Sequence, residues 1–433
     1  MNRRSLLSLA VTGALALGAA ACGGSGPAAQ AGPVKITVWS WKPASAGLAA
    51  VAKDFEQAHP NIKVTVQDIG NPAIWDKITI GMAAGGKGLA DVMHIGVDYL
   101  PGYLEKFPGG LADLRKFGAD KHKDAFAKGL WPTVTGKDGG VYAMPWEVNP
   151  QGFFYRSDIF DKAGVDPASI KTWDDAIEAG KKIKEKTGAY LIGLKASVVD
   201  MDFFQALLQQ QGAFYFDGQG NVTLNAAPAV QAMSLIKKMN DAGIVADISG
   251  EGTWKQLVSA GKLAVLPWPA WAVSYLEEDR ADQKGKWRVM QPPAVTQGGK
   301  RAAIVNATYL SVSGTSPHPQ EAYTFVEYAL TRPEAINKAF REGGVFPALT
   351  AAYADPMFTK PSDFYGGQPA LKTFVDSLTE GADATYYSGD YARALKIASD
   401  AQTKVLLKGA DPAAALTEAA QQLAQQTGRK LAG

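Results

Sequence analysis

The chain has 433 residues, of which 44 are Lys or Arg and 42 are Asp or Glu, so it carries almost no net charge. A near-neutral balance argues against a surface that binds nucleic acid or an anionic membrane, because such surfaces need clustered basic side chains. The length exceeds the roughly 250 to 300 residues at which a single hydrophobic core stops growing. We therefore expect two lobes. The chain has one cysteine, so no disulfide within the chain links them.

The first 21 residues have the pattern of a cleaved export signal. Asn2-Arg3-Arg4 is a short basic head, residues 6–21 form an uncharged apolar run, and Ala19-Ala20-Ala21 supplies small residues for a signal peptidase. The run is shorter than the roughly 20 apolar residues of a membrane-spanning helix. Arg3-Arg4 also admits twin-arginine export. Removal of residues 1–21 leaves 42 basic and 42 acidic residues, so the exported body is formally neutral.

The single cysteine, Cys22, follows this signal directly. The arrangement resembles a bacterial lipoprotein signal, in which the cysteine becomes the first mature residue and carries the lipid, although Ala19 stands where such signals usually have Leu. The alternative is ordinary secretion with a leftover thiol. Lipidation accounts for an unpaired cysteine in an exported protein, and residues 22–33 then form a flexible tether. We expect a protein anchored by lipid to the outer face of the cytoplasmic membrane.

Strand and helix patterns alternate through the first part of the mature chain. Alternating apolar and polar residues predict a strand at 34–39, and further strands are predicted at 62–66 and 91–95. Between them, apolar residues at helical spacing predict one helix that ends at His59-Pro60 and another from Pro72 to Gly85-Gly86. This succession is typical of a parallel sheet covered by helices.

A second α/β unit begins after Gly139-Gly140. Thr172 is placed to cap the start of a helix that ends at Gly188. Further strands are predicted at 152–155, 191–194, 263–266 and 303–313, and further helices at about 201–211, 228–241, 253–260, 319–342 and 391–426. The fold class is therefore α/β, with a mainly parallel sheet flanked by helices in each lobe.

Local catalytic signatures are absent from the sequence. It has no nucleophile elbow and no phosphate-binding glycine loop with its lysine. Its four histidines, His59, His94, His122 and His318, are scattered, so we expect neither a metal centre nor a cofactor. A pair of glycosidase carboxylates has no local motif, and an exported carbohydrate-active enzyme stays open as the rival from another class.

Aromatic residues stand beside polar ones where predicted strands end, and in open α/β sheets ligands lie beyond the carboxyl ends of the strands. Aromatic faces at such places pack against the C–H groups of a sugar, while Asp, Glu, Asn and Lys side chains take its hydroxyls. The candidate ligand residues are Trp41, Lys42, Asp98, Trp146, Glu147, Asn149, Trp271, Tyr386 and Tyr387.

Each candidate also has a structural explanation. Asp98 is placed to cap a following helix, Glu147 to pair with a lysine between the lobes, and Tyr386 and Tyr387 to pack. Trp268 is a weaker candidate than Trp271. The other tryptophans are assigned to the core, and they are Trp39, Trp75, Trp131, Trp173, Trp254 and Trp287.

The segment Pro145–Gly164, followed by Thr172-Trp173-Asp174-Asp175, resembles the signature segment of family 1 extracellular solute-binding proteins. These are the maltose-binding-protein-like receptors of carbohydrate ABC importers. Three further segments resemble landmarks of the family in the expected order: Ala90-Asp91-Val92, Gly261–Val273 and Gly343–Pro347. The resemblance extends over residues 34–425. Arg156 stands where many members have Asn or Asp, and Trp146-Glu147 replaces smaller residues.

The resemblance implies a two-lobed periplasmic-binding-protein-like fold of type II. Lobe one would comprise residues 34–144 plus 305–344 and lobe two residues 145–304 plus 345–433, joined by a three-stranded hinge near 143–149, 302–307 and 343–349. It also implies that Trp41, Asp98, Asn149, Trp271 and Tyr386 match cleft positions, with Lys42, Glu147 and Tyr387 close by.

The function implied is that of a monomeric receptor, which binds a di- or oligosaccharide between its lobes and delivers it to an ABC permease served by a cytoplasmic ATPase. Within the binding class, polyamines and glycerophosphodiesters stay open as ligands. Carboxylates beside aromatic rings would suit a polyamine. A phosphate would need helix N-termini or arginines at the cleft.

Overall fold

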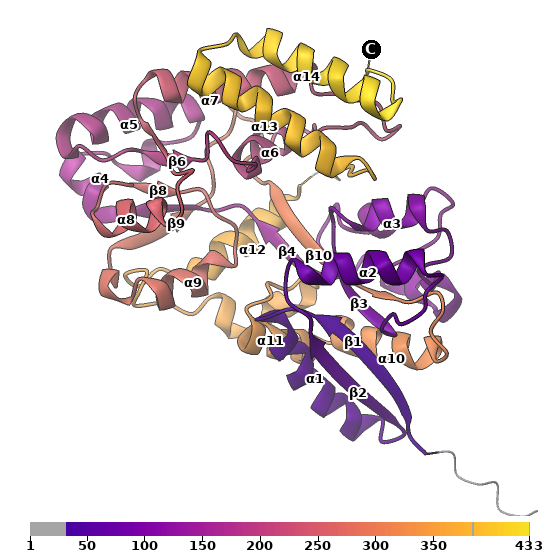
Figure 1. Cartoon of the computed structure of the whole chain (residues 1–433). Coiled ribbons are helices and arrows are strands. Elements are labelled where there is room, and N and C mark those ends of the chain that lie inside the picture. The colour runs from indigo at the N-terminus through magenta and orange to yellow at the C-terminus, as the bar shows by residue number, and fades with distance from the viewer. Residues whose placement is uncertain (1–31, 383–384, 433) are drawn as a thin grey trace, which may run out of the picture.

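The computed structural model describes residues 32–382 and 385–432, so Cys22 and the export signal lie outside the described residues. The chain forms two lobes of helices and sheets, with strands β4 (Met144–Pro150) and β10 (Ile304–Val312) between them (Figure 1). Within the described ranges no helix is both long and apolar enough to cross a membrane.

The first lobe is built on a five-stranded sheet in the order β2-β1-β3-β10-β4. Strand β1 (Val34–Ser40) runs parallel to both β2 (Ile62–Asp68) and β3 (Val92–Gly96), as predicted from the sequence. Strand β10 runs antiparallel to its two neighbours, β3 and β4. The first half of this sheet therefore has the predicted parallel order, and a strand from far along the chain completes it.

Helices cover this sheet on both sides. Helix α1 (Ala44–Ala58) packs against α10 (Pro319–Thr331) and α11 (Pro333–Gly343). Helices α2 (Ala73–Ala83) and α3 (Leu100–Lys106) lie on the side that faces the second lobe (Figure 1). Gly47 permits the contact of α1 with α11, because a Cβ atom there would collide with the backbone of Ala339.

The second lobe contains a three-stranded sheet and a two-stranded sheet. In the first, β5 (Phe153–Arg156) is antiparallel to both β8 (Val265–Leu266) and β9 (Trp287–Met290). In the second, β6 (Ile192–Leu194) is parallel to β7 (Val245–Asp247). This differs from the expected mainly parallel sheet, because the alternation that marks a strand is the same for either direction of pairing.

The helices that were predicted for the second lobe begin and end close to their predicted positions. In α5 (Trp173–Thr187), the Thr172 hydroxyl accepts a bond from the backbone N–H of Asp175, and the Asp175 carboxylate accepts one from the backbone N–H of Thr172. Gly188 ends this helix in a left-handed conformation. The remaining helices are α4 (Ser157–Ala163), α6 (Asp202–Gln209), α7 (Ala227–Asp241), α8 (Thr253–Ser259), α9 (Ala272–Asp279), α12 (Ala370–Glu380), α13 (Tyr391–Lys408) and α14 (Pro412–Thr427). Of these, α4, α9 and α12 were not predicted.

Three chain segments cross between the lobes side by side. Strand β4 pairs with β10 on one side. On its other side, the N–H of Val148 donates to Phe346 O at 3.0 Å and the N–H of Ala348 donates to Trp146 O at 2.9 Å. These segments coincide with the three hinge crossovers expected from the sequence. The residue boundaries of the lobes at 144, 304 and 344 stay a prediction, because one hydrophobic core continues from the five-stranded sheet to α9 and α12.

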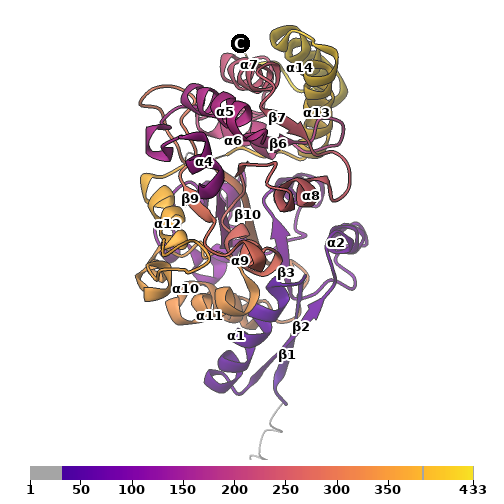
Figure 2. The ribbon, with the colours of Figure 1, turned by 90° about the vertical axis from the view of Figure 1, so that its left-hand side faces the viewer.

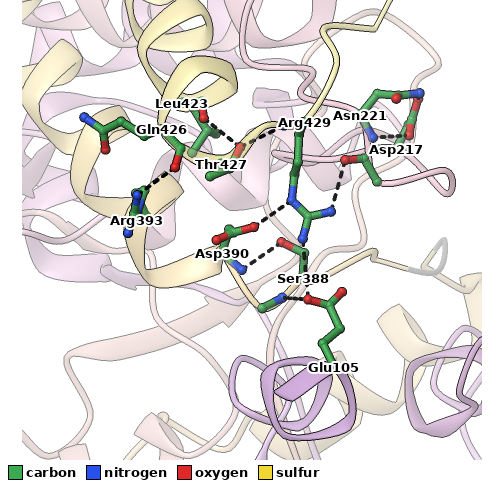
Figure 3. A network of polar contacts seen from close by, with 12 residues as sticks. Glu105, Asp217, Asn221, Ser388, Asp390, Arg393, Leu423, Gln426, Thr427 and Arg429 are labelled. Atoms are coloured by element: carbon green, nitrogen blue, oxygen red, sulfur yellow. Dashed lines mark hydrogen bonds and ion pairs between the residues drawn. The ribbon is translucent and has the colours of Figure 1, made fainter.

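The two lobes also contact each other between α3 and the C-terminal residues. Glu105 on α3 accepts a hydrogen bond from the backbone N–H of Gly389 at 3.2 Å, and the same oxygen lies 3.5 Å from Nη2 of Arg429 (Figure 3). Arg429 is held in turn by Asp390, 2.8 Å from its Nε. We call Glu105, Gly389 and Arg429 the latch. Figure 2 shows the two lobes from another side, with α5, α7, α13 and α14 at the top and α1, β1 and β2 at the bottom.

Candidate functional site

Parallel pairing brings the first group of candidate residues to one edge of the sheet. Trp41 follows the carboxyl end of β1, and Asp98 follows the carboxyl end of β3. The register of β1 on β3 pairs Trp39 with Met93, so Ser40 lies next to His94. Because parallel strands end at the same edge, residues more than 50 positions apart in the chain become neighbours.

An aromatic wall forms at this edge from Trp41, Trp75 and Tyr99. The Trp41 ring lies edge-on to Trp75 at 5.1 Å between centroids, and Trp75 stacks on Tyr99 at 4.2 Å. The ring of His94 stacks parallel to Trp41, at 3.6 Å and an interplanar angle of 5°. Since His94 covers one face of Trp41, a ligand has the opposite face to stack on.

Behind this wall, four side chains form a buried relay of hydrogen bonds. His94 is fully buried, with Nδ1 at 2.9 Å from Ser40 Oγ and Nε2 at 2.7 Å from Thr308 Oγ1. Thr308 donates to Glu147 Oε2 at 3.1 Å. Burial lowers the pKa of His94 well below its usual value, so the imidazole is neutral. Burial raises the pKa of Glu147, and hydrogen bonds from Asn149 and Thr308 oppose that rise.

Two carboxyl groups, one from each lobe, have raised pKa values. Burial raises the pKa of Asp98 to about 6, against hydrogen bonds from the backbone N–H groups of Asp98 and Tyr99. On the second lobe, Asp202 keeps some surface exposed to solvent, but the protein atoms around it reduce its hydration. This desolvation and the charge of Asp200 raise its pKa to about 6. The charge of Asp98 adds to the rise for Asp202, so the two groups interact across the lobes.

The second lobe contributes a cavity of about 320 Å³. Its apolar side is formed by Trp254, Trp268, Trp271 and Tyr275, with the Trp268 and Trp271 rings 5.7 Å apart. Its polar side is formed by Lys195, Asp200, Asp202, Gln151 and Gln402. Lys195 Nζ lies 2.6 Å from an Asp200 oxygen. Trp271 is 40% exposed, which leaves ring surface available to a ligand.

A second cavity of about 560 Å³ lies between α3, residues 132–142 and residues 216–220. Tyr386 and Tyr387 line it, together with the latch residues Glu105 and Arg429. Tyr386 is 49% exposed, whereas Tyr387 packs against Phe214 and Tyr391 at 4.7 and 4.8 Å. Burial, followed by the neighbouring Tyr391 and the charge of Asp98, raises the pKa of Tyr387.

The structure thus brings some candidate residues together and separates others. Trp41 stacks on His94, and Glu147 bonds to Thr308, the hydrogen-bond partner of His94. Asp98 lies just beyond the end of β3. Trp271 belongs to the cavity of the second lobe, and Tyr386 and Tyr387 belong to the second cavity. Their role in ligand binding stays a prediction.

Three candidates are placed unfavourably for direct contact with a ligand in this conformation. Trp146 is fully buried and Asn149 is 1% exposed, because β4 is the covered edge of the sheet where the third hinge segment adds. Lys42 has its side chain 80% exposed and lies 3.7 Å from Asp68. We therefore expect Trp146 to support the site from behind its surface.

The structural explanations offered for Asp98 and Glu147 are not confirmed. The Asp98 carboxylate bonds to the backbone N–H groups of Asp98 and Tyr99, and Tyr99 rather than Asp98 precedes α3. Glu147 bonds to Thr308 and Asn149 and not to a lysine among the described residues.

Sequence reasoning missed His94, Thr308, Asp202 and Lys195, and assigned Trp75 and Trp254 to the core alone. Trp75 is 9% exposed and does belong to the core, yet it also braces Trp41. Trp254 lines the cavity of the second lobe. One signal was available for His94, namely a polar residue inside the apolar strand Val92–Gly96.

Several polar atoms of this region have no hydrogen-bond partner among the described residues. They are the acceptors Asn149 Oδ1 and Gln151 Oε1 and the donor Trp146 Nε1, all buried, and Gln151 also lines the cavity of the second lobe. A buried acceptor without a partner costs about 1 to 3 kcal/mol, so such atoms favour a ligand rich in donors. No group of His, Cys, Asp and Glu in the described ranges is arranged to hold a metal ion.

Two lobes, a three-segment hinge and an aromatic site at the ends of sheet strands define a solute receptor of the periplasmic-binding-protein class. The sequence model of the bacterial extracellular solute-binding protein family matches residues 39–336. The chain belongs to this family.

Individual relatives extend the comparison over the whole chain. A lactose-binding protein of Rhizobium radiobacter is 29% identical over 94% of this chain and 96% of its own length. An arabinooligosaccharide-binding protein of Bacillus subtilis is 24% identical over 98% and 100%. The solved structure of an ABC transporter associated binding protein from B. animalis subsp. lactis, in complex with β-1,6-galactobiose, is 27% identical with a TM-score of 0.73, and the match covers 93% of this chain and all of that one.

Replacing Asp98 by Asn should make the protein more stable at neutral pH. The folded pKa of Asp98, about 6, lies above its ordinary value of 3.8, so the folded state binds the proton more tightly and the free energy of unfolding falls as pH rises from about 4 to 6. Asp98→Asn should raise this free energy at pH 7 by about 1 to 2 kcal/mol and flatten the profile below pH 6. Urea unfolding between pH 4 and 7.5 measures both, with the exposed Asp124→Asn as control. A less stable variant at pH 7 would mean that the carboxylate is stabilised overall.

Proposed function

We propose that the protein is the extracytoplasmic receptor of an ABC importer and binds a di- or oligosaccharide between its lobes. The observation that carries this proposal is the presence of an aromatic surface on each lobe, around Trp41 on the first and Trp271 on the second, with carboxylates and amides beside them. A sugar offers C–H faces to the rings and hydroxyl protons to the acceptors. The sugar ligands in the names of the relatives support the same class of ligand.

The charges of the site also bear on the other ligand classes. A glycerophosphodiester would place an anion near Asp98 and Asp202, which would repel it. A polyamine would be attracted by the same carboxylates, and it is therefore the competitor that a binding test must include.

In this proposal, transport depends on the opening and closing of the two lobes. A ligand that contacts both lobes favours the closed form, by as much as its affinity for that form exceeds its affinity for the open one. In this proposal the permease recognises the closed form, the receptor acts as a monomer and no bond of the sugar is broken. The relatives are binding proteins, which supports a receptor over an exported carbohydrate-active enzyme.

A ligand panel tests the proposed function. We expect lactose, β-1,6-galactobiose or an arabino-oligosaccharide to raise the melting temperature of residues 23–433, since a ligand at 100 times its Kd adds about 2.7 kcal/mol. The sugar should be recovered unchanged. Trp41→Ala and Trp271→Ala should each weaken binding by about 1 to 3 kcal/mol, if each ring stacks on the sugar in a desolvated site. A shift with polyamines alone, or hydrolysis of the sugar, would reject the carbohydrate receptor.

Removing the latch should favour the open form. Glu105→Ala takes away the contacts of α3 with Gly389 and Arg429, and a partly exposed ion pair of this kind is worth about 0 to 1 kcal/mol. We expect a Kd for the sugar up to about five times higher and a larger radius of gyration in ligand-free small-angle scattering. Arg393→Met is the matched control, because Arg393 bonds to Gln426 within the second lobe (Figure 3). If Glu105→Ala equals this control in both measurements, the latch does not hold the lobes.

We also propose that Cys22 carries the lipid anchor. The support is the position of Cys22 directly after a signal peptide and before a tether rich in glycine and alanine. Cys22→Ala should move the protein from the membrane fraction to the soluble extracytoplasmic fraction, which immunoblotting of the fractions measures. Retention of the variant at the membrane would show that another part of the protein anchors it.

A further inference from the structure

The buried relay has a defined direction. Thr308 has one hydroxyl proton, which it donates to Glu147 Oε2. Its oxygen must therefore accept at the 2.7 Å contact with His94, so Nε2 of His94 carries the imidazole proton. In a neutral imidazole the other nitrogen is an acceptor, and Ser40 donates to it. All three hydrogen bonds point from Ser40 towards the carboxylate of Glu147.

The same imidazole also sets the position of an aromatic ring. One face of His94 lies flat against Trp41 at 3.6 Å, and Trp146 lies 4.5 Å from His94 with its ring tilted by 53°. His94 and Trp146 are both fully buried. Because protein interiors are closely packed, the two rings leave His94 little freedom, and Trp41 is held in turn.

The pairing of β4 with β10 contains a β-bulge at the relay. Thr308 pairs with Glu147, but the next residue, Tyr309, pairs with Pro145, so Trp146 is an extra residue in β4. Such β-bulges bend a strand and re-aim its side chains, and they are frequent beside binding and active sites. Here the bulge allows Trp146 to pack on His94 while the neighbouring Glu147 stays partly accessible.

The carboxylate of Glu147 keeps acceptor capacity for a ligand. Oε2 accepts from Thr308, the Asn149 side chain bonds to the same carboxylate, and the residue is partly accessible. A carboxylate offers about four acceptor sites, so these bonds orient it without saturating it. Near Trp41, of which His94 covers one face, such an oriented acceptor suits a hydroxyl that points out from the edge of a stacked sugar ring.

We propose that His94 is a positioning residue, which through its Nε2–H and Thr308 orients Glu147 to accept one hydroxyl of the sugar while its ring backs the Trp41 platform. This inference rests on the proposed carbohydrate function and deepens it. It assigns the specificity of the first lobe to a single hydroxyl of the ligand. It also places the residues that select this hydroxyl on both hinge strands, β4 and β10.

The test compares hydroxyl-bearing and hydroxyl-lacking side chains at position 308. Thr308→Val keeps the shape and removes the relay, whereas Thr308→Ser restores the hydroxyl. By calorimetry with lactose and β-1,6-galactobiose, we expect Thr308→Val to raise Kd about tenfold, because it removes a hydrogen bond to a charged group, and Thr308→Ser to recover most of the loss. Thr37→Val is the matched control, because Thr37 bonds to the Asp91 carboxylate on the same sheet but outside the relay.

Monodeoxy analogues of the two disaccharides separate positioning from mere packing. For the analogue that lacks the hydroxyl accepted by Glu147, the wild type and Thr308→Val should bind equally. For every other analogue the tenfold difference should persist. An equal loss for all analogues would mean that the variant disturbs the site in general, and it would overturn the proposal.

A double-mutant cycle tests the role of His94. His94→Phe keeps a ring beneath Trp41 but removes both hydrogen bonds, so its loss should match that of Thr308→Val, and the double variant should lose no more than either. Additive losses would overturn the relay. If His94→Phe does not fold, which its melting curve would show, the series at position 308 decides alone. A wild type that binds no sugar would reject the proposed function, whereas a wild type that binds with Thr308→Val unchanged would reject the relay alone.

Discussion

The hydrogen bonding of β4 to segments on both of its sides is the constraint on which this structure depends. Strand β4 lies between β10 and residues 346–348, and these three segments cross between the lobes together. Two irregularities interrupt its pairing with β10, one between Ile304 and Asn306 and one between Thr308 and Tyr309. A ladder that is continuous in space but irregular in register holds the lobes together while its strands can bend.

The ligand chemistry that we propose for the first lobe lies on the same strands. Glu147 is a residue of β4 and Thr308 is a residue of β10, and Thr308 bonds both to Glu147 and to His94 on the adjacent strand. A change in hinge geometry therefore changes the orientation of an acceptor in the site. This coupling needs no path through the body of a lobe, because the hinge and part of the site consist of the same residues.

The carboxylates of the two lobes share one property, surroundings that disfavour their charged form. Desolvation raises the pKa of Asp98 on the first lobe and, together with the charge of Asp200, that of Asp202 on the second. Bringing the lobes together with two ionised carboxylates is costly unless donors lie between them. A neutral ligand with many hydroxyls meets this need, and the aromatic surfaces around Trp41 and Trp271 then contribute the apolar part of the contact.

The sequence by itself determined the features that local chemistry encodes. The capping pair Thr172 and Asp175 with the terminal Gly188 specified helix α5, and alternation specified β1 and β2, because caps and periodicity act within a few residues. The tertiary structure alone decided the direction of β8 and β9 beside β5, the burial of Trp146 and the relay, in which His94 and Thr308 are 214 positions apart. Such pairings depend on how strands from distant parts of the chain meet, and no local pattern of residues records that.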